Sequence, residues 1–233
     1  MNGGLATNAK LLDALVSDWG RAEPHGLAVC VPYPYLGQAQ AALSGSANAW
    51  GAQDVSAHRA GAYTGEVAAS MLVEFGCRYA IVGHSERRQL HRETDLEVAG
   101  KAVMAHEAGI TPIVCVGETL AEREAGTTRD VVLRQIEAVL SQLGAAVSAI
   151  VVAYEPVWAI GTGKTATPDQ AQEVHAVLRK RLVRAPAPDV TILYGGSVKA
   201  SNAAALFSKE DVDGALVGGA SLNAEEFLAI TRA

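Results

Sequence analysis

The amino-acid sequence predicts an α/β fold built on a parallel sheet, and three observations support that class. The chain has 233 residues, 49% hydrophobic and 19% charged, so it can bury one large core. Short apolar runs recur along it without polar–apolar alternation, as in strands that are buried on both faces. Amphipathic helical patterns lie between most of these runs, which predicts right-handed parallel crossovers.

Seven apolar runs are expected to be strands. In chain order they are Leu27–Val31, Ala47–Gly51, Tyr79–Val82, Thr111–Val116, Ala149–Tyr154, Val190–Tyr194 and Ala215–Val217. No strand precedes the first helical pattern, whose apolar stripe consists of Leu11, Leu12, Leu15, Val16 and Trp19. A second stripe runs from Val131 to Leu143, and a glycine follows each stripe. Without a linker or a composition break, residues 1–233 are expected to form a single domain with an open or closed parallel sheet.

Composition excludes several classes of function. A net charge of -6 and a pI near 5.5 argue against nucleic-acid binding, which needs clustered cations. No apolar run reaches the roughly 18 residues of a membrane span, and no signal peptide is visible, so we expect a cytoplasmic protein without a membrane partner. Cys30, Cys77 and Cys115 lack metal-ligand spacing and are expected to be isolated thiols.

The residues that follow the predicted strands are the candidates for chemistry, because parallel α/β proteins gather their sites at the carboxyl ends of strands. Glu155 follows Ala149–Tyr154 directly, and partial burial there would suit a general base. His84 follows Tyr79–Val82 and precedes an expected helix start at Ser85-Glu86. The amides of that helix should disfavour protonation of the imidazole and leave a neutral donor.

Glycine pairs end the last two predicted strands. Gly195-Gly196 precede Ser197, and Gly218-Gly219 follow Ala215–Val217. Glycine lets the backbone turn sharply and bring its amides close to a bound group. Helices are expected to start just downstream, near Ser201 and near Asn223, with free amides that attract anions. Two such turns on consecutive strands predict a phosphate-binding site.

The segment after Glu155 has the composition of a lid over the site. Pro156 fixes the geometry next to the acid, Ala159 and Ile160 are apolar, and Gly161 and Gly163 give the backbone freedom. Closure would keep water away from the reacting centre.

Together these segments resemble the triosephosphate isomerase family along the whole chain. The motifs that carry the resemblance are GAYTGEV at 61–67, YAIVGHSERR at 79–88, CVGETLAERE at 115–124, AYEPVWAIGTGK at 153–164, YGGSV at 194–198 and LVGGAS at 216–221. The resemblance implies a (β/α)8 TIM barrel that interconverts dihydroxyacetone phosphate and D-glyceraldehyde 3-phosphate through an enediolate, without a metal or an organic cofactor.

The resemblance also assigns roles to residues of this chain. Glu155 would be the base, and neutral His84 would polarise the carbonyl oxygen. Glu86 and Cys115 would support the site. The phosphate would be held by Gly161, Ser197, Gly218 and Gly219. The lid would consist of Pro156, Val157, Trp158, Ala159, Ile160, Gly161, Thr162, Gly163 and Lys164.

A homodimer is implied as well, because the family's counterpart of Gln53–Glu66 reaches into the neighbouring subunit. Thr64 and Glu66 would lie at that contact.

The front of the sequence departs from the family pattern. Family members begin with a strand carrying Gly-Asn-Trp-Lys, followed by Met-Asn-Gly, whereas this sequence opens with Met1-Asn2-Gly3. We therefore expect the first barrel strand and its catalytic lysine to be absent, with unpaired sheet edges at Leu27–Val31 and Ala215–Val217. This leaves an alternative function: a phosphate-ligand-binding barrel with little or no turnover. A barrel acting on another phosphorylated sugar is a third reading.

Overall fold

The structure, a computed structural model, describes residues 1–20, 25–160 and 165–233. Its centre is a parallel sheet in which seven strands pair in chain order. The strands are β1 (Ala28–Val31), β2 (Ala49–Ala52), β3 (Tyr79–Val82), β4 (Thr111–Val116), β5 (Val151–Tyr154), β6 (Ile192–Tyr194) and β7 (Gly214–Ala215). All seven predicted strands are thus confirmed. The bounds of β3 and β4 are as predicted, and those of the other five strands differ by one or two residues at one or both ends; β7, for example, starts one residue earlier and ends two residues earlier than expected.

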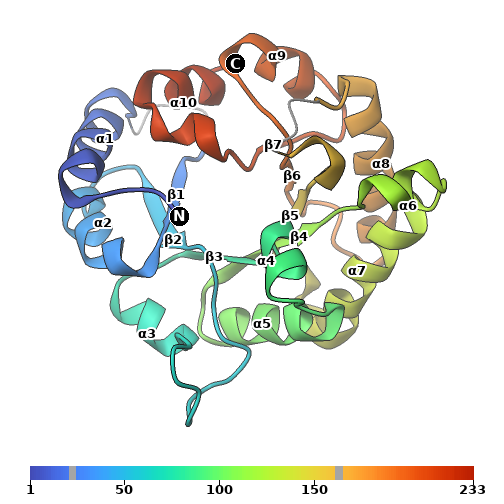
Figure 1. Ribbon diagram of the computed structural model, residues 1–233, viewed down its shortest axis with the longest axis horizontal. Helices are drawn as coiled ribbons and strands as arrows, with labels where there is room; N and C mark the ends of the chain where they lie inside the picture. The colour runs from blue at the N-terminus through green and yellow to red at the C-terminus, as the bar shows by residue number, and fades with distance from the viewer. Residues whose placement is uncertain (21–24, 161–164) are drawn as a thin grey trace.

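The helices surround this sheet and the strands lie inside the ring (Figure 1). They are α1 (Leu5–Asp18), α2 (Leu36–Leu43), α3 (Ala69–Glu74), α4 (Ser85–Leu90), α5 (Asp95–Glu107), α6 (Leu120–Glu124), α7 (Thr128–Leu143), α8 (Pro168–Arg184), α9 (Ala200–Phe207) and α10 (Ala224–Thr231). Short 3-10 turns are η1 (Tyr33–Tyr35), η2 (Gly144–Ala149), η3 (Val157–Ala159) and η4 (Gly219–Leu222). This alternation around a curved parallel sheet is the arrangement of a TIM barrel.

Both faces of the central strands are buried, which explains their continuous hydrophobicity. Val82, Val114 and Val152 face the helices and belong to the main core. Ile81, Ile113 and Ala153, one position away in each strand, form a separate cluster inside the barrel. Because successive side chains point to opposite faces, each position in these strands has an apolar neighbour.

The sheet is open where its first and last strands lie. Within the described residues β1 pairs only with β2 and β7 only with β6, so the predicted edges at these two strands are confirmed. Helices α1 and α10 pack together beside this opening, through Leu15 and Trp19 on one side and Phe227 and Leu228 on the other. Val16 was expected in the apolar stripe of the first helix, but its side chain is exposed. The stripe is one residue narrower because α1 packs against the barrel on one face only.

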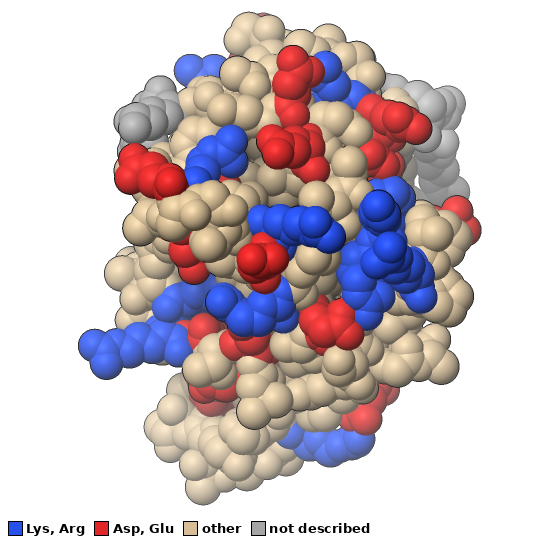
Figure 2. All heavy atoms as spheres, turned by 90° about the vertical axis from the view of Figure 1, so that its right-hand side faces the viewer, with Lys and Arg blue, Asp and Glu red and all other residues tan. Residues whose placement is uncertain are grey.

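Charged side chains on the outer surface are mixed in sign. Figure 2 shows the face that lies on the right-hand side of Figure 1, and on it basic groups lie beside acidic ones. Among the described residues, no helix is both long enough and apolar enough to cross a membrane.

Candidate active site

Glu155 lies at the carboxyl end of β5. The residues next to it at the ends of the two adjoining strands, β4 and β6, are glycines. The Glu155 amide donates to the carbonyl of Val116 at 2.8 Å, which extends the β4–β5 pairing past the last strand residue. A Cβ on Gly117 would lie 1.8 Å from the Glu155 carbonyl oxygen, and a Cβ on Gly195 would lie 2.9 Å from the Glu155 Cγ. The adjoining strand ends therefore need glycine: Gly117 leaves room for the Glu155 backbone, and Gly195 leaves room for its side chain.

The Glu155 carboxylate is buried, with 2% of its side chain exposed, and uncharged donors surround it. Its Oε2 accepts the Ser85 amide at 2.9 Å, and its Oε1 accepts the Ser85 hydroxyl at 3.2 Å. Burial raises the pKa of the Cys115 thiol, which lies close enough for the Glu155 charge to raise it further. Sequence reasoning missed Ser85. The signal that could have identified it is its place at the first position of a helix beside a strand end, where its amide is free.

His84 is brought to Glu155 by the turn between β3 and α4. Gly83 has a φ of 69°, and its position would force a Cβ to within 2.6 Å of Val98, so only glycine makes this turn without strain. His84 is the N-cap of α4, and its Nδ1 accepts the Glu86 amide at 3.2 Å. Its Nε2 lies 2.9 Å from Glu155 Oε1. An imidazole with Nδ1 as acceptor carries its proton on Nε2 and donates it to the carboxylate.

The pKa of His84 is shifted in the direction opposite to the one expected from the sequence. Burial lowers it, but the hydrogen bond and the negative charge of Glu155 raise it more, so the net direction is upward in this ligand-free arrangement. The sequence predicted resistance to protonation from the helix amides alone. That prediction was wrong for the ligand-free protein because the sequence did not show that Glu155 contacts the imidazole. The amide contact at Nδ1 by itself favours the neutral ring, because a protonated imidazole has no acceptor there.

Two residues expected in supporting roles differ in their proximity to this pair. Cys115 is buried, and the pKa of its thiol lies well above the usual range because of burial and the nearby Glu155 charge. The thiol therefore stays protonated. The side chain of Glu86 is largely exposed, and its carboxylate is 4.0 Å from His84 Nδ1. Its backbone amide, rather than its carboxylate, is the group that orients His84.

The two glycine turns lie at the same end of the barrel as Glu155. Tyr194 of β6 pairs with Ala215 of β7, and Ser197 and Gly218 each lie three residues further along. A Cβ at Gly218 or Gly219 would meet no atom of the described residues within 4 Å, so this part of the structure leaves the space above the turn open. Among the described residues, the amides of Ser197 and Gly219 donate to no protein acceptor. These amides could hold an anion.

One part of the predicted phosphate site is occupied by the protein itself. Helix α9 was expected to offer free amides at its start. Instead, Lys199 N donates to Asn202 Oδ1 at 2.8 Å, and Ala200 N donates to Glu226 Oε1 at 2.8 Å. The anion site is therefore confined to the turns themselves, because side chains already cap the helix that follows the first turn.

The first half of the predicted lid is anchored through Glu118, which sequence reasoning also missed. The Glu118 carboxylate is fully buried and accepts hydrogen bonds from Trp158 Nε1 at 2.9 Å and from Tyr154 Oη at 3.2 Å. Arg123 pairs with it at 3.0 Å and lies over the Trp158 ring. The Val157 amide donates to the Glu118 carbonyl at 3.2 Å.

Within the lid, Pro156 leads into η3, Ala159 is buried and Ile160 is partly buried. Gly161, Thr162, Gly163 and Lys164 lie outside the described residues, and so does the part of the phosphate site assigned to Gly161.

Comparisons with known proteins agree with this geometry. A family model described as triosephosphate isomerase matches residues 1–233. A protein named triosephosphate isomerase from Ralstonia nicotianae is 63% identical over 237 residues, which cover all of this chain and 95% of that protein. Proteins of the same name from Delftia acidovorans and Dechloromonas aromatica are 61% and 59% identical, each with 95% of its length covered.

Proposed function

The chain belongs to the triosephosphate isomerase family, and from that premise we propose that it interconverts dihydroxyacetone phosphate and D-glyceraldehyde 3-phosphate. The observation that carries the proposal is the 2.9 Å contact between His84 Nε2 and Glu155 Oε1, at the end of the barrel where the two glycine turns lie. A buried carboxylate and an imidazole donor, side by side, can serve as a base and an electrophile for one proton transfer.

In the proposed reaction, Glu155 removes a proton from the carbon next to the substrate carbonyl. The electron pair of the broken C–H bond forms a carbon–carbon double bond, and the carbonyl electrons move onto the oxygen. His84 stabilises that oxygen through Nε2–H. Glu155 then returns its proton to the former carbonyl carbon, the other carbon forms the new C=O bond, and the hydroxyl proton of that carbon passes to the former carbonyl oxygen. These are the established roles of this acid–base pair in the family. Ser197, Gly218, Gly219 and Gly161 are proposed to hold the phosphate.

The ligand-free contacts imply that the substrate must displace some of them. Both Glu155 oxygens accept hydrogen bonds from Ser85, and the Nε2 proton of His84 is directed at Glu155 rather than at a substrate. We propose that the Glu155 carboxylate leaves Ser85 when the lid closes, because Glu155 directly precedes Pro156, the first residue of the lid. His84 can then donate to the substrate oxygen, and the cause that raises its pKa is removed.

A coupled assay that measures both directions of isomerisation tests this function. The expected result is turnover that inorganic phosphate inhibits competitively and that Glu155→Gln lowers by about 10²–10⁴-fold, with Glu124→Gln as the control at an exposed glutamate. Phosphate binding with turnover at the background rate would instead identify the chain as a phosphate-ligand-binding barrel. Turnover of another phosphorylated sugar in place of the triose phosphates would contradict the substrate assignment.

We also propose that the chain forms a homodimer through the loop between β2 and α3. This loop extends out of the ring (Figure 1), and Thr64 and Glu66 near its end are exposed. His58 and Tyr63 stack at a centroid distance of 3.8 Å, which stiffens the loop. Next to the loop, Met71 of α3 and Phe75, the residue that follows α3, are exposed apolar side chains, which fits burial by a second copy. Light scattering at several concentrations would give the mass, and a monomer at all of them would contradict the proposal.

A further inference from the structure

We propose that Glu226 is a positioning residue that holds the two halves of the phosphate site in register. The proposal rests on the function above, because it assumes that Ser197, Gly218 and Gly219 bind the substrate phosphate. Glu226 belongs to neither turn and was not a candidate from the sequence. The structure places its carboxylate on the first amide of α9, at Ala200.

Each half of the site is fixed locally by its own hydrogen bonds. In the first half, Asn202 accepts from Lys199 N at 2.8 Å and donates to the Ser197 carbonyl at 3.2 Å, so it closes the turn after β6. In the second half, Ser221 donates to the Gly218 carbonyl through its amide at 2.9 Å and through its hydroxyl at 2.7 Å. These bonds shape each turn but do not connect one turn with the other.

The strands give the two halves little direct connection. Strand β7 has two residues, and its pairing with β6 ends with the Leu216 amide, which donates to the Tyr194 carbonyl at 3.0 Å. Past that bond, no hydrogen bond of the described residues joins the segment 195–198 to the segment 217–222. The relative position of the two turns must therefore be set by the helices that follow them.

Glu226 supplies that link between the helices. It lies in the first turn of α10, where its own amide donates to the N-cap Asn223 at 3.0 Å, and α10 begins directly after η4. Its Oε1 accepts a hydrogen bond at 2.8 Å from the backbone amide of Ala200, which is the first residue of α9. A carboxylate at a helix start is favoured by the helix dipole and by a free amide. One side chain thereby connects the helix behind Ser197 to the helix behind Gly218-Gly219.

This link predicts an effect on phosphate binding rather than on the chemical step. Amides that hold an anion must keep their spacing to within a fraction of an ångström. If α9 and α10 move apart, Ser197 and Gly219 can no longer contact the same phosphate, while Glu155 and His84 on β5 and β3 are unaffected. Loss of Glu226 should therefore weaken binding of every ligand that carries a phosphate.

The test compares Glu226→Ala and Glu226→Asp with Glu226→Gln, and uses Glu225→Ala as the control. Glu225 lies in the same helix turn and is exposed, so its removal changes the charge but not the link. Asp is one methylene too short to reach Ala200, and Gln keeps the acceptor without the charge. The measurements are the affinity for inorganic phosphate by calorimetry, kcat and KM with glyceraldehyde 3-phosphate, and kcat/KM with unphosphorylated glyceraldehyde.

We expect Glu226→Ala and Glu226→Asp to weaken phosphate binding and raise KM by about ten-fold, the scale of one hydrogen bond to a charged group. Glyceraldehyde turnover should stay unchanged, and Glu226→Gln should bind phosphate at least as tightly as the unmodified protein. Phosphate affinity within two-fold of the unmodified protein in both shortened variants would overturn the proposal. An equal loss with glyceraldehyde would also overturn it, because that result indicates general structural damage.

The calorimetric measurement separates this proposal from the proposed function. If the unmodified protein binds phosphate but does not isomerise triose phosphates, the function fails, and the Glu226 variants still report on the phosphate site. If the protein isomerises its substrate and the Glu226 variants behave like the Glu225 control, the function stands and the positioning role fails.

Discussion

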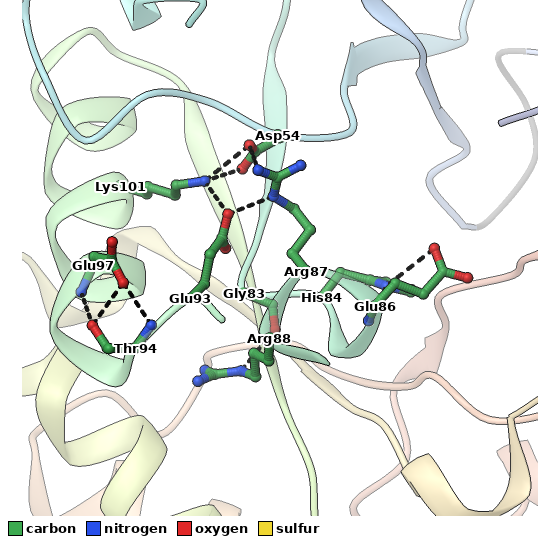
Figure 3. A network of polar contacts seen from close by, with 10 residues as sticks. All are labelled: Asp54, Gly83, His84, Glu86, Arg87, Arg88, Glu93, Thr94, Glu97 and Lys101. Carbon is green, nitrogen blue, oxygen red and sulfur yellow. Dashed lines mark hydrogen bonds and ion pairs between the residues drawn. The ribbon is translucent and has the colours of Figure 1, made fainter. Parts of the chain in front are cut away.

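Two buried carboxylate sites flank the same short helix, α4, and they are held in opposite ways. On one side Glu155 accepts from the amide and hydroxyl of Ser85 and from His84, which are uncharged donors when the imidazole is neutral. On the other side Asp54 and Glu93 are held by Arg87 and Lys101, all four charged (Figure 3). The Lys101 ammonium lies 2.7 Å from Asp54 and 2.6 Å from Glu93.

The kind of partner determines how easily each carboxylate can change its contacts: Glu155 can exchange them, whereas Asp54 and Glu93 are fixed. Hydrogen bonds to uncharged donors have a modest net free energy, so Glu155 can exchange them for contacts with a substrate. Breaking a buried ion pair leaves an uncompensated charge, which costs several times more. Burial raises the pKa of Asp54 even though Lys101 and Arg87 lower it, so this charge depends on both cations. The charged group of four braces the loop after β2 against α4 and α5, and it leaves the catalytic side of α4 free to change partners.

The largest expected effect is on catalysis at Glu155. Glu155→Gln keeps the volume and hydrogen-bonding capacity of the side chain but removes the base, so kcat should fall by about 10²–10⁴-fold. Thermal stability should change little, because Ser85 can still donate to the amide oxygen. Steady-state kinetics and a melting curve on the same sample check both parts. If Glu155→Gln destabilised the protein as much as removal of Lys101 from the charged group of four, the two carboxylate sites would not differ in the way described.

The next effect is on stability at Lys101. Lys101→Met removes the shared cation and leaves Asp54 and Glu93 buried with only Arg87, so the free energy of unfolding should fall by about 3–5 kcal/mol. Lys180→Met, at an exposed lysine of α8, is the matched control and should be nearly neutral. Denaturant titrations of both variants give the comparison. If Lys101→Met is as stable as the control, the charged group is not a brace.

A smaller effect is expected at Ser85. Ser85→Ala removes the hydroxyl that Glu155 Oε1 accepts at 3.2 Å but keeps the amide that Oε2 accepts at 2.9 Å. The free energy of unfolding should fall by about 1 kcal/mol, and kcat/KM should change by less than about ten-fold. Kinetics that fall as far as those of Glu155→Gln would show that the hydroxyl has a direct part in the reaction.

The smallest effect concerns the pKa of His84. Because Glu155 raises this pKa more than the Glu86 charge does, Glu155→Gln should lower the His84 pKa in the ligand-free protein, where burial then outweighs the remaining effect of Glu86. A group whose folded pKa is raised stabilises the fold at low pH and loses that contribution as the pH rises through the folded pKa. The Gln variant should therefore lose more stability at pH 5.5 than at pH 9. Imidazole NMR titrations of both proteins check the direction of the pKa change. An unchanged His84 pKa would show that another group controls its protonation.

The sequence alone determined the fold class and most of the candidate site. Continuous apolar runs indicated strands buried on both faces, and the first residues after those runs included Glu155, His84, Ser197 and Gly218. These signals are local, because a strand end and the turn after it are contiguous in the chain. The family motifs then assigned roles that the residue pattern left open.

Only the tertiary structure decided which of these residues touch. Ser85 and Glu155 are 70 positions apart, and Ala200 and Glu226 are 26 apart, so no periodicity could pair them. The direction of the His84 pKa shift was predicted wrongly for the same reason, since this pKa depends on a carboxylate from another strand. The sequence determined where each strand ends and which side chain follows it. The curvature of the sheet decided which of those ends meet, because contacts between separate βα units depend on packing of the whole barrel rather than on any local preference of the chain.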